Sequence, residues 1–517
     1  MKEKFLPYLI YLIAFLFILQ FRYNLDKNSL YITSDGAIKL YQTAQYKENG
    51  FFSLECIYPA KEIDATYKYY PISYPWAIFT VKNIPCVLEY PPFFYWIGSV
   101  LLYFQSVSLL LYLPLLFFGI NIFIFDLVLQ RMRLIPSYRI ITTLLVFISF
   151  PLLTAMDYTE NPAFQTLYLL GFYYGFRLTQ NSLNTVQTFL TGLFFGLAFF
   201  LRLEILIPFA FFCGFYFLGT REFKKTFLLS LGFILVVSVF ILYNLKVSGH
   251  PLGFRYVSSI DFNDNAKADI WKRLNFLKAT LWGNQMMVGV FKFQPLLWLF
   301  LILPIYAHAK GFRSKSGFIL LAAGWTSMIA IPLYITVYGG VGYFGLRYIE
   351  APFYLIALGW SFYLSELNFF QEKRIKWIIV FILVGISYFN WVSTREGLKL
   401  LKNSSSENAV LQTFLKQTER YVIHSSFYTS IWMGNSFLER KHVHIKGNEQ
   451  MEEFLNHIAR NEIFILLLSP KDIYISEDIP KKLHENYLAQ IELEKFPIQI
   501  LEEKKLNGIR LVKARKN

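Results

Sequence analysis

The sequence predicts a polytopic α-helical membrane protein of about 11 transmembrane helices, followed by a small α/β domain on the exoplasmic side. Hydrophobic residues make up 55% of the 517 residues and charged residues only 16%, and the mean hydropathy is +0.39. The apolar residues gather in runs long enough to cross a hydrocarbon core of roughly 30 Å. From residue 395 onward the sequence is instead rich in Lys and Glu and alternates short helical and strand patterns.

Eleven apolar runs bounded by charged residues are expected to span the membrane. They are residues 5–21, 107–129, 139–155, 162–178, 186–201, 203–218, 226–245, 293–309, 316–337, 344–364 and 375–391. A further apolar stretch, residues 91–104, has only roughly 14 residues, whereas a spanning helix usually needs 17 to 25. We therefore expect it to form an interfacial or re-entrant helix.

The basic residues predict the orientation. If residues 91–104 do not cross, every segment on one side is basic, including the cluster from Arg131 to Arg139 and the pair Lys224 and Lys225. The opposite side receives a long loop (22–106), a second large loop (246–292) and the C-terminal tail. The positive-inside rule then places the N-terminus in the cytoplasm and these loops on the exoplasmic face of a cell membrane. The formal net charge of +15 thus reflects orientation, and a nucleic-acid partner is not expected.

The first apolar run lacks a small-residue cleavage site, so we expect it to be retained as a span. Residues 1–394 are expected to form the transmembrane domain, and residues 395–517 a soluble exoplasmic domain. Within the latter, the pattern predicts helices at 407–418 and 449–460, strands at 421–425, 442–445 and 463–468, and a closing hairpin around Asn507 and Gly508.

Three cysteines are too few for a disulfide framework. Cys213 lies within a predicted span, whereas Cys56 and Cys86 share the first exoplasmic loop. An oxidising compartment would allow a bridge between them that closes about 30 residues. The sequence leaves two alternatives open, this disulfide or two free buried thiols.

Acidic residues at the exoplasmic ends of the spans are the candidates for chemistry. Asp35 lies near the start of the first loop, and Asp157 and Glu160 lie in the short turn that opens the fourth span. Helix capping alone would explain an acid at either place, since helix N-termini favour carboxylates. Two carboxylates on one face would instead divide acid, base or metal-binding work between them.

Cationic side chains are expected at the same level. Arg347 begins the tenth span, where a guanidinium suits a phosphate, although snorkelling to lipid headgroups is the alternative. Arg202 is a second candidate for the phosphate, but an ion pair with Glu204 that steadies its turn is the favoured interpretation. His250, in a Ser-Gly-His-Pro sequence, is more often a turn residue than a catalyst.

These features together resemble a known family. They are an early Asp in a long first loop, the aromatic run Tyr-Pro-Pro-Phe-Phe-Tyr-Trp (90–96), an acidic turn before the fourth span, and Gly-Tyr-Phe-Gly-Leu-Arg-Tyr (342–348). The set is similar to the GT-C membrane glycosyltransferases. Within them it most resembles the family 39 type, the protein O-mannosyltransferases and the aminoarabinose transferases of lipid A. The resemblance covers roughly residues 1–395, and the tail is similar to the appendage of many members.

The resemblance implies an inverting transfer of a sugar from a polyprenyl-phosphate donor to an acceptor hydroxyl at the exoplasmic face. Asp35 would be the base, Glu160 or Asp157 would orient the acceptor or hold a cation, and Arg347 would stabilise the leaving phosphate. The substrate groove would include Tyr90, Pro91, Pro92, Tyr348 and His250. The partners would be membrane lipid, the lipid-linked donor, and a protein, glycan or lipid acceptor.

The sequence departs from the family pattern at two positions, which bear on metal binding and on the choice of sub-family. Gly36 follows Asp35 where members often have a second acid, so a divalent metal is not indicated. Tyr90 stands where members often have His or Lys. Two other classes stay open: a secondary transporter, which the mid-span acid Asp126 would suit, and a polytopic scaffold or sensor without catalysis. The sequence does not identify the sugar or the acceptor.

Overall fold

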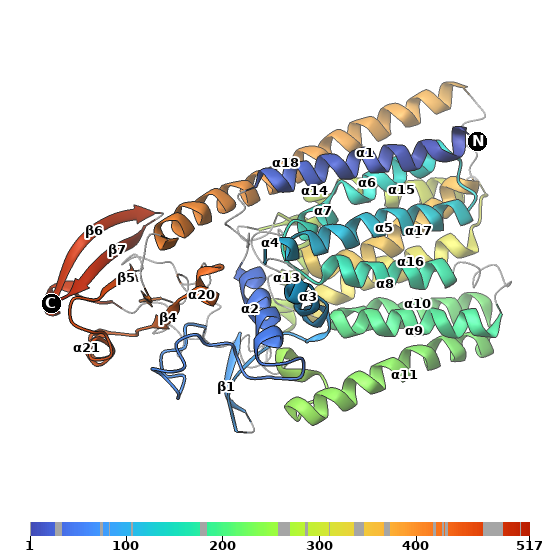
Figure 1. Cartoon of the computed structure of the whole chain (residues 1–517). Coiled ribbons are helices and arrows are strands. Elements are labelled where there is room, and N and C mark those ends of the chain that lie inside the picture. Colours follow the sequence, from blue (N-terminus) through green and yellow to red (C-terminus); the bar gives the residue numbers. More distant parts are fainter. Residues whose placement is uncertain are drawn as a thin grey trace. The chain divides into compact units, whose positions relative to one another are not determined.

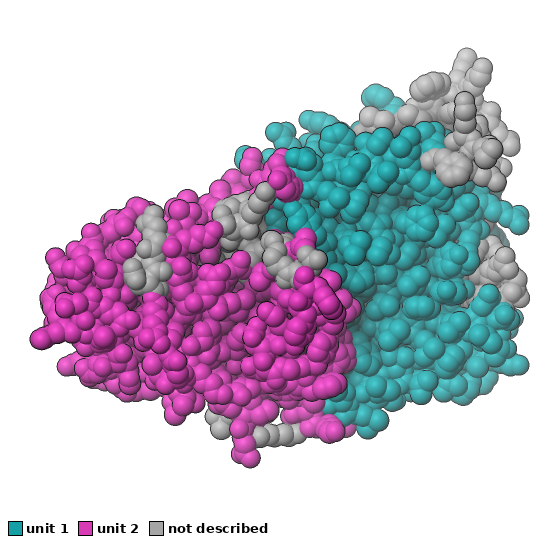
Figure 2. Space-filling view, in the orientation of Figure 1, with its two compact units in different colours: residues 1–22, 112–243, 267–401 teal, residues 23–111, 244–266, 402–517 magenta. Residues whose placement is uncertain are grey.

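The computed structural model describes most of the chain. The described residues are 2–25, 34–72, 76–81, 83–104, 107–175, 184–256, 269–284, 288–309, 311–335, 346–366, 373–416, 420–426, 429, 433–468, 490–506 and 508–517. They form two compact units, coloured separately in Figure 2: residues 1–22, 112–243 and 267–401, and residues 23–111, 244–266 and 402–517. We call them the helical unit and the loop unit. The predicted boundary near residue 395 falls inside one long helix.

The helical unit consists of helices in the described residues (Figure 1). Their bounds are α1 (Lys2–Asn24), α5 (Tyr112–Arg131), α6 (Pro136–Phe147), α7 (Phe150–Ala155), α8 (Asn161–Gly175), α9 (Thr185–Leu201), η2 (Leu203–Ile205), α10 (Leu206–Thr220), α11 (Phe223–Ser248), α13 (Ile270–Trp282), α14 (Val290–Phe293), α15 (Leu296–Ala309), α16 (Lys315–Tyr334), η5 (Leu346–Ile349), α17 (Glu350–Glu366) and α18 (Lys373–Lys416). The ends of α1, α11 and α18 extend into the loop unit.

Five segments of the described chain are long and apolar enough to cross a membrane by length and composition. They are Leu6–Asn24, Tyr112–Arg131, Leu203–Thr220, Phe223–Ser248 and Lys315–Tyr334. Thr185–Leu201 and Leu296–Ala309 are apolar but shorter. The predicted multi-pass membrane architecture is thus confirmed, while the count of 11 crossings stays a prediction. Parts of the second large loop and of the glycine-rich segment before Arg347 lie outside the described residues.

Small residues let two helices of this unit approach each other closely. A Cβ atom added at Gly192 of α9 would lie 2.0 Å from the carbonyl oxygen of Leu229 in α11, and one added at Gly232 of α11 would lie 2.3 Å from that of Phe189. Both distances are far inside van der Waals contact. Glycines at these positions therefore allow backbone-to-backbone packing of the kind common between membrane helices.

The loop unit joins the first large loop to the C-terminal residues. The loop contributes α2 (Ser34–Glu48), β1 (Ala77–Val81), β2 (Ile84–Leu88), α3 (Phe93–Phe104) and α4 (Val107–Leu110). The C-terminal part contributes β3 (Tyr421–His424), α20 (Ser436–Glu439), β4 (Lys441–His444), α21 (Asn448–Leu455), β5 (Ile463–Leu468), η7 (Leu493–Lys495), β6 (Ile498–Leu506) and β7 (Ile509–Lys516). The structure confirms the predicted C-terminal strands and closing hairpin.

The C-terminal strands form one five-stranded mixed sheet in the order β4-β3-β5-β7-β6. β4 and β5 both pair with β3 in parallel, and β7 pairs antiparallel with β5 and β6. The end of α18 covers one face, where Leu411, Phe414 and Leu415 pack on Val422 and Ile465 in a fully buried cluster. β3 is buried along its whole length and β5 at every residue after the first, as is usual for central parallel strands.

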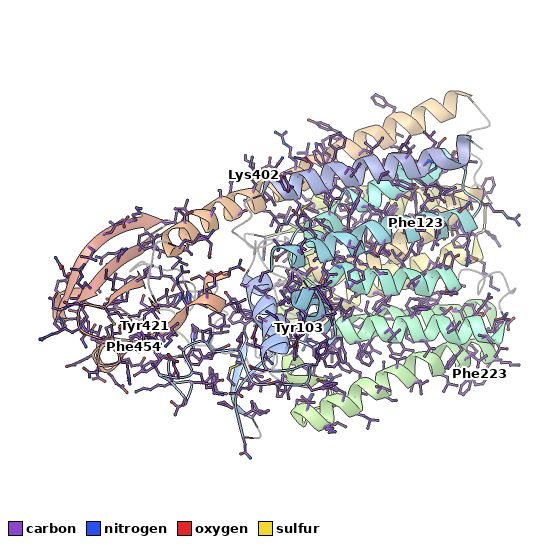
Figure 3. The ribbon with its side chains drawn as sticks, in the orientation of Figure 1. Tyr103, Phe123, Phe223, Lys402, Tyr421 and Phe454 are labelled. Atoms are coloured by element: carbon purple, nitrogen blue, oxygen red, sulfur yellow. A yellow bond between two sulfur atoms is a disulfide. The ribbon has the colours of Figure 1, made fainter. Side chains whose placement is uncertain are left out.

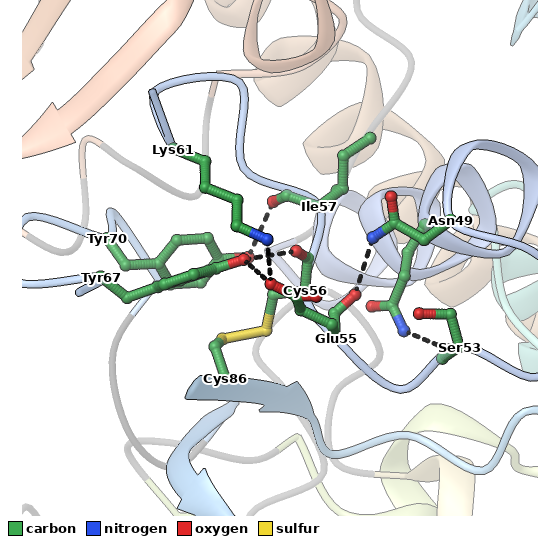
Figure 4. The surroundings of a disulfide bond; sticks show 10 residues. Asn49, Ser53, Glu55, Cys56, Ile57, Lys61, Tyr67, Tyr70 and Cys86 are labelled. Atoms are coloured by element: carbon green, nitrogen blue, oxygen red, sulfur yellow. Dashed lines mark hydrogen bonds and ion pairs between the residues drawn. A yellow bond between two sulfur atoms is a disulfide. The ribbon is translucent and has the colours of Figure 1, made fainter. Parts of the chain in front are cut away.

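A disulfide closes the first loop (Figure 4). Cys56 and Cys86 are bonded across 30 residues, and the amide of Cys56 donates to the carbonyl of Cys86 at 3.0 Å. Of the two alternatives that the sequence left open, the structure therefore shows the bridge. Beyond it, the 12-residue helix α3 exposes Ile97, Val100 and Phe104 along one side. Its length and apolar side agree with the expected interfacial helix.

Candidate functional site

A buried polar network joins several helices of the helical unit. Glu350, the first residue of α17, is fully buried and accepts from Gln165 at 2.7 Å and from Asn161 at 3.2 Å, both residues of α8. Tyr354 donates to Gln165 at 2.9 Å, and Asn121 of α5 donates to the same amide oxygen at 3.2 Å. Buried polar groups linked in this way fix the relative positions of the helices that carry them.

Arg202 extends this network at the turn between α9 and η2. Its guanidinium donates to Glu204 through Nε at 2.6 Å, and to Glu160 and Asn161 through Nη1 at 3.2 and 3.1 Å. The side chain is only 1% exposed. The predicted Arg202–Glu204 ion pair is present, and Glu160 joins it. Two carboxylates therefore face one guanidinium.

Asp157 lies in the same acidic turn, where its Oδ1 accepts from the amide of Tyr158 at 2.8 Å. Such a bond is typical of an acid that shapes its own turn. The buried guanidinium of Arg22, at the end of α1, interacts electrostatically with Asp157. Asp157 is therefore a further carboxylate in the same turn as Glu160, and its cationic neighbour is Arg22.

Arg347 lies in η5, directly before α17. Its Nη2 donates to the hydroxyl of Tyr348 at 3.2 Å, and its own carbonyl accepts from Arg202 at 3.4 Å. The guanidinium of Arg202 also lies 5.2 Å from the ring centroid of Tyr348. The helical unit therefore brings Arg347, Tyr348, Arg202 and Glu160 together.

Asp35 belongs to the loop unit, where it is the second residue of α2; its side chain lies outside the described part of the structure. One turn further on, the ammonium of the buried Lys39 lies 5.0 Å from the ring centroid of Tyr90. The guanidinium of Arg255 lies 5.1 Å from the same ring. Two cations thus gather at one aromatic residue beside the helix that carries Asp35.

The predicted groove residues of the loop unit occupy this region. The carbonyl of Tyr90 accepts from Gln42 of α2 at 2.6 Å, and Pro91 and Pro92 lead directly into α3. His250 sits in a turn, where its Nδ1 accepts from the amide of Leu252 at 3.2 Å and its ring stacks on Tyr256 at 5.1 Å. The geometry of His250 is that of a turn residue.

Several residues of these clusters were not singled out from the sequence. Gln165 and Asn161 donate to Glu350, and Tyr354 donates to Gln165. Lys39 and Arg255 lie at the ring of Tyr90. Lys39 follows Asp35 by four residues. A helix that begins before Asp35 places both residues on one face. The others carry no local signal. Among the described residues, no three His, Cys, Asp or Glu side chains are placed to hold a metal ion.

Comparisons with known proteins show similarity in structure. No protein-family model matches the sequence, and no curated protein matches it. ArnT from Cupriavidus metallidurans, in a crystal structure bound to undecaprenyl phosphate, aligns with a TM-score of 0.55 and 11% identity over 98% of this chain and 97% of its own. Its apo crystal structure aligns over the same shares with a TM-score of 0.51. This chain therefore shares the fold of ArnT over nearly its whole length.

Proposed function

We propose that this chain is an integral membrane glycosyltransferase. It transfers a sugar from a polyprenyl-phosphate donor to an acceptor hydroxyl at the exoplasmic face, with inversion at the anomeric carbon. The observation that carries the proposal is a pair of cations at one aromatic ring. Lys39, on the helix α2 that also carries Asp35, and Arg255 both lie at the ring of Tyr90. A base and an anion-binding region are what such a transfer requires. The fold shared with ArnT, which binds undecaprenyl phosphate in its crystal structure, supports the choice of donor.

The proposed roles follow from charge. Asp35 removes the proton from the acceptor hydroxyl as the hydroxyl attacks the anomeric carbon. Glu160 or Asp157 orients the acceptor, and Arg347 stabilises the negative charge that grows on the departing lipid phosphate. Lys39 and Arg255 are a second candidate pair for this phosphate, since cations bind phosphate oxygens strongly. Arg202 pairs with Glu160 and Glu204. We therefore assign it mainly a structural role in these ion pairs, and binding of the phosphate only as a secondary role.

The proposed topology has 11 crossings, a cytoplasmic N-terminus and exoplasmic loops and tail in a cell membrane. The disulfide between Cys56 and Cys86 supports an oxidising side for the first loop. A cysteine placed at Lys224, in an otherwise intact chain, tests the orientation. We expect no modification by an impermeant thiol reagent in intact cells, and modification there would reverse the topology.

The principal alternative is a secondary transporter, and the contacts of Asp126 do not support it. This acid of α5 pairs with Arg139 of α6 and accepts from Tyr11 of α1 at 2.8 Å, and it is fully buried. An acid that is satisfied by two partners on neighbouring helices ties those helices together. The charged candidates Glu160, Arg202 and Arg347 lie at or beside helix ends, which suits surface chemistry better than transport through the middle of the membrane.

The decisive experiment is a donor panel. Purified protein is incubated with polyprenyl-phosphate-linked sugars and candidate acceptors, and the products are identified by mass spectrometry. We expect one donor to be consumed with release of polyprenyl phosphate and formation of a glycosylated acceptor, with and without a chelator. Solute uptake into proteoliposomes without consumption of any donor would instead establish the transporter.

A further inference from the structure

We propose that Phe437, in the C-terminal part of the loop unit, is a positioning residue for the reaction: it holds α2, and with it Asp35, from the side of the helix that faces away from the reacting groups. This inference rests on the proposed role of Asp35 as the base. It assigns the C-terminal residues a part in the chemistry, although Phe437 itself touches no reacting atom.

The contact between Phe437 and α2 is direct and buried. The ring of Phe437 lies 4.3 Å from the ring of Tyr41, centroid to centroid, and both residues are fully buried. Aromatic pairs at this distance contribute roughly 0.5 to 1.5 kcal/mol beyond their buried area. A short helix of 15 residues has little stability of its own in water, so packing of this kind decides where it lies.

The helical repeat places Tyr41 behind the proposed site. At 3.6 residues per turn, Asp35 and Lys39 lie on nearly the same face, while Tyr41 is turned away from Asp35 by about 120°. Lys39 faces Tyr90, together with Arg255. Phe437 thus supports the back of α2 while the front carries the charged groups. A shift of Tyr41 would rotate or tilt the helix and move Asp35 relative to Tyr90.

Phe437 is itself held in place by a chain of buried hydrogen bonds. Ser436 Oγ lies 2.9 Å from His442 Nε2, His442 Nδ1 lies 2.8 Å from His424 Nε2, and His424 Nδ1 lies 3.1 Å from Thr429 Oγ1. All four residues are at most 2% exposed. The His442 ring also lies 6.0 Å from the ring of Phe437. Side chains locked by such a network provide a rigid support for a functional residue.

Other contacts hold the first loop to the same sheet, but they lie elsewhere on the loop. The amide of His444 donates to the carbonyl of Tyr69 at 2.9 Å, and Lys68 pairs with Glu453 in an exposed salt bridge. Exposed pairs of this kind contribute little to stability. Phe454 is fully buried, and its ring centroid lies 5.6 Å from that of Tyr69 and 6.1 Å from that of Tyr421. Figure 3 labels Phe454 and Tyr421. Phe454 is therefore a matched control, because it joins the same two segments through Tyr69, which lies outside α2.

The test compares Phe437→Ala with Phe454→Ala in the full-length protein. A misplacement of about 1 Å can cost on the order of 100-fold in rate, so we expect Phe437→Ala to lower kcat by roughly 10- to 100-fold and to leave the KM for donor within about twofold. Phe454→Ala should lower kcat by less than about threefold. Phe437→Leu, which keeps apolar volume at the position, should recover part of the loss and serves if the alanine variant does not fold.

Amide hydrogen exchange supplies a readout that is independent of activity. We expect residues 38–46 of α2 to exchange at least tenfold faster in Phe437→Ala and to be unchanged in Phe454→Ala. Unchanged exchange in α2, or faster exchange with an unchanged kcat, would overturn the positioning role. If the unaltered protein transfers no sugar from any donor, the proposed function fails, while the exchange of α2 still decides whether Phe437 positions this helix.

Discussion

Removal of the disulfide between Cys56 and Cys86 should lower the free energy needed to open the first loop. The size of the change follows from the number of residues between the two cysteines. The bond spans 30 residues. In the chain-entropy model, closing a loop of that length removes about 12 cal/mol/K from the unfolded segment, or about 3.6 kcal/mol at 25 °C.

The assay is amide exchange at Lys68 and Tyr69. Both lie inside the closed loop, and their amides donate to the carboxylate of Asp64 at 2.9 and 2.7 Å. In a Cys56→Ala/Cys86→Ala double variant, a loss of about 3.6 kcal/mol would speed their exchange by up to roughly 400-fold. The bonds themselves are unchanged by the substitution, so faster exchange reports opening of the loop.

Cys213→Ala is the matched control, since Cys213 is a buried free thiol in α10. It should leave the exchange of Lys68 and Tyr69 unchanged. A double variant whose loop amides exchange within about twofold of the natural protein would refute the reasoning. So would a non-reducing digest in which the peptides containing Cys56 and Cys86 are not linked.

Three further predictions concern stability. Arg202→Met leaves two buried carboxylates without their guanidinium and should destabilise the helical unit by about 3 to 5 kcal/mol; an unchanged thermal midpoint in detergent would contradict this. Burial lowers the pKa of His442 to about 3 and that of His444 to about 3. The unfolded chain takes up their protons near pH 6.5, so stability that is complete above that pH should fall by about 2 kcal/mol for each at pH 5. Denaturant titrations across this range check the trend, and a stability that rises as the pH falls would reverse the sign. Gly192→Ala should separate α9 from α11 and lower the thermal midpoint, whereas Gly214→Ala, with no atom within 4 Å of its Cβ position, should not.

The sequence predicted most of the elements, because their signals are local. Charged residues bound the apolar runs, and helices occupy these runs in the structure. Two details were beyond such reasoning. The run 139–155 is split at Ser149, where the backbone is extended (φ −152°, ψ −153°) before Pro151. α18 continues as one helix of 44 residues. It runs through Gly397 and residues 403–406 (Asn-Ser-Ser-Ser), which are weak helix formers, so local propensity does not predict its length.

The candidate site was predictable only where its partners are close in sequence. Arg202 and Glu204 are two residues apart, and their ion pair was expected. Gln165 and Glu350 are 185 residues apart, and no pattern in a single sequence connects them. The same holds for Arg255 at the ring of Tyr90. Such contacts come from the packing of helices, which periodicity alone does not specify.

The central claim is that Asp35 is the base in a sugar transfer from a lipid-phosphate donor. The most direct measurement is the rate of transfer of a labelled sugar from the donor that the panel identifies, compared between the natural protein and Asp35→Asn. Asn is isosteric with Asp but cannot accept the proton, and general base catalysis contributes typically 100- to 10,000-fold. The account predicts a loss of at least about 100-fold, with membrane insertion and donor binding unchanged. Full transfer activity in Asp35→Asn would contradict it.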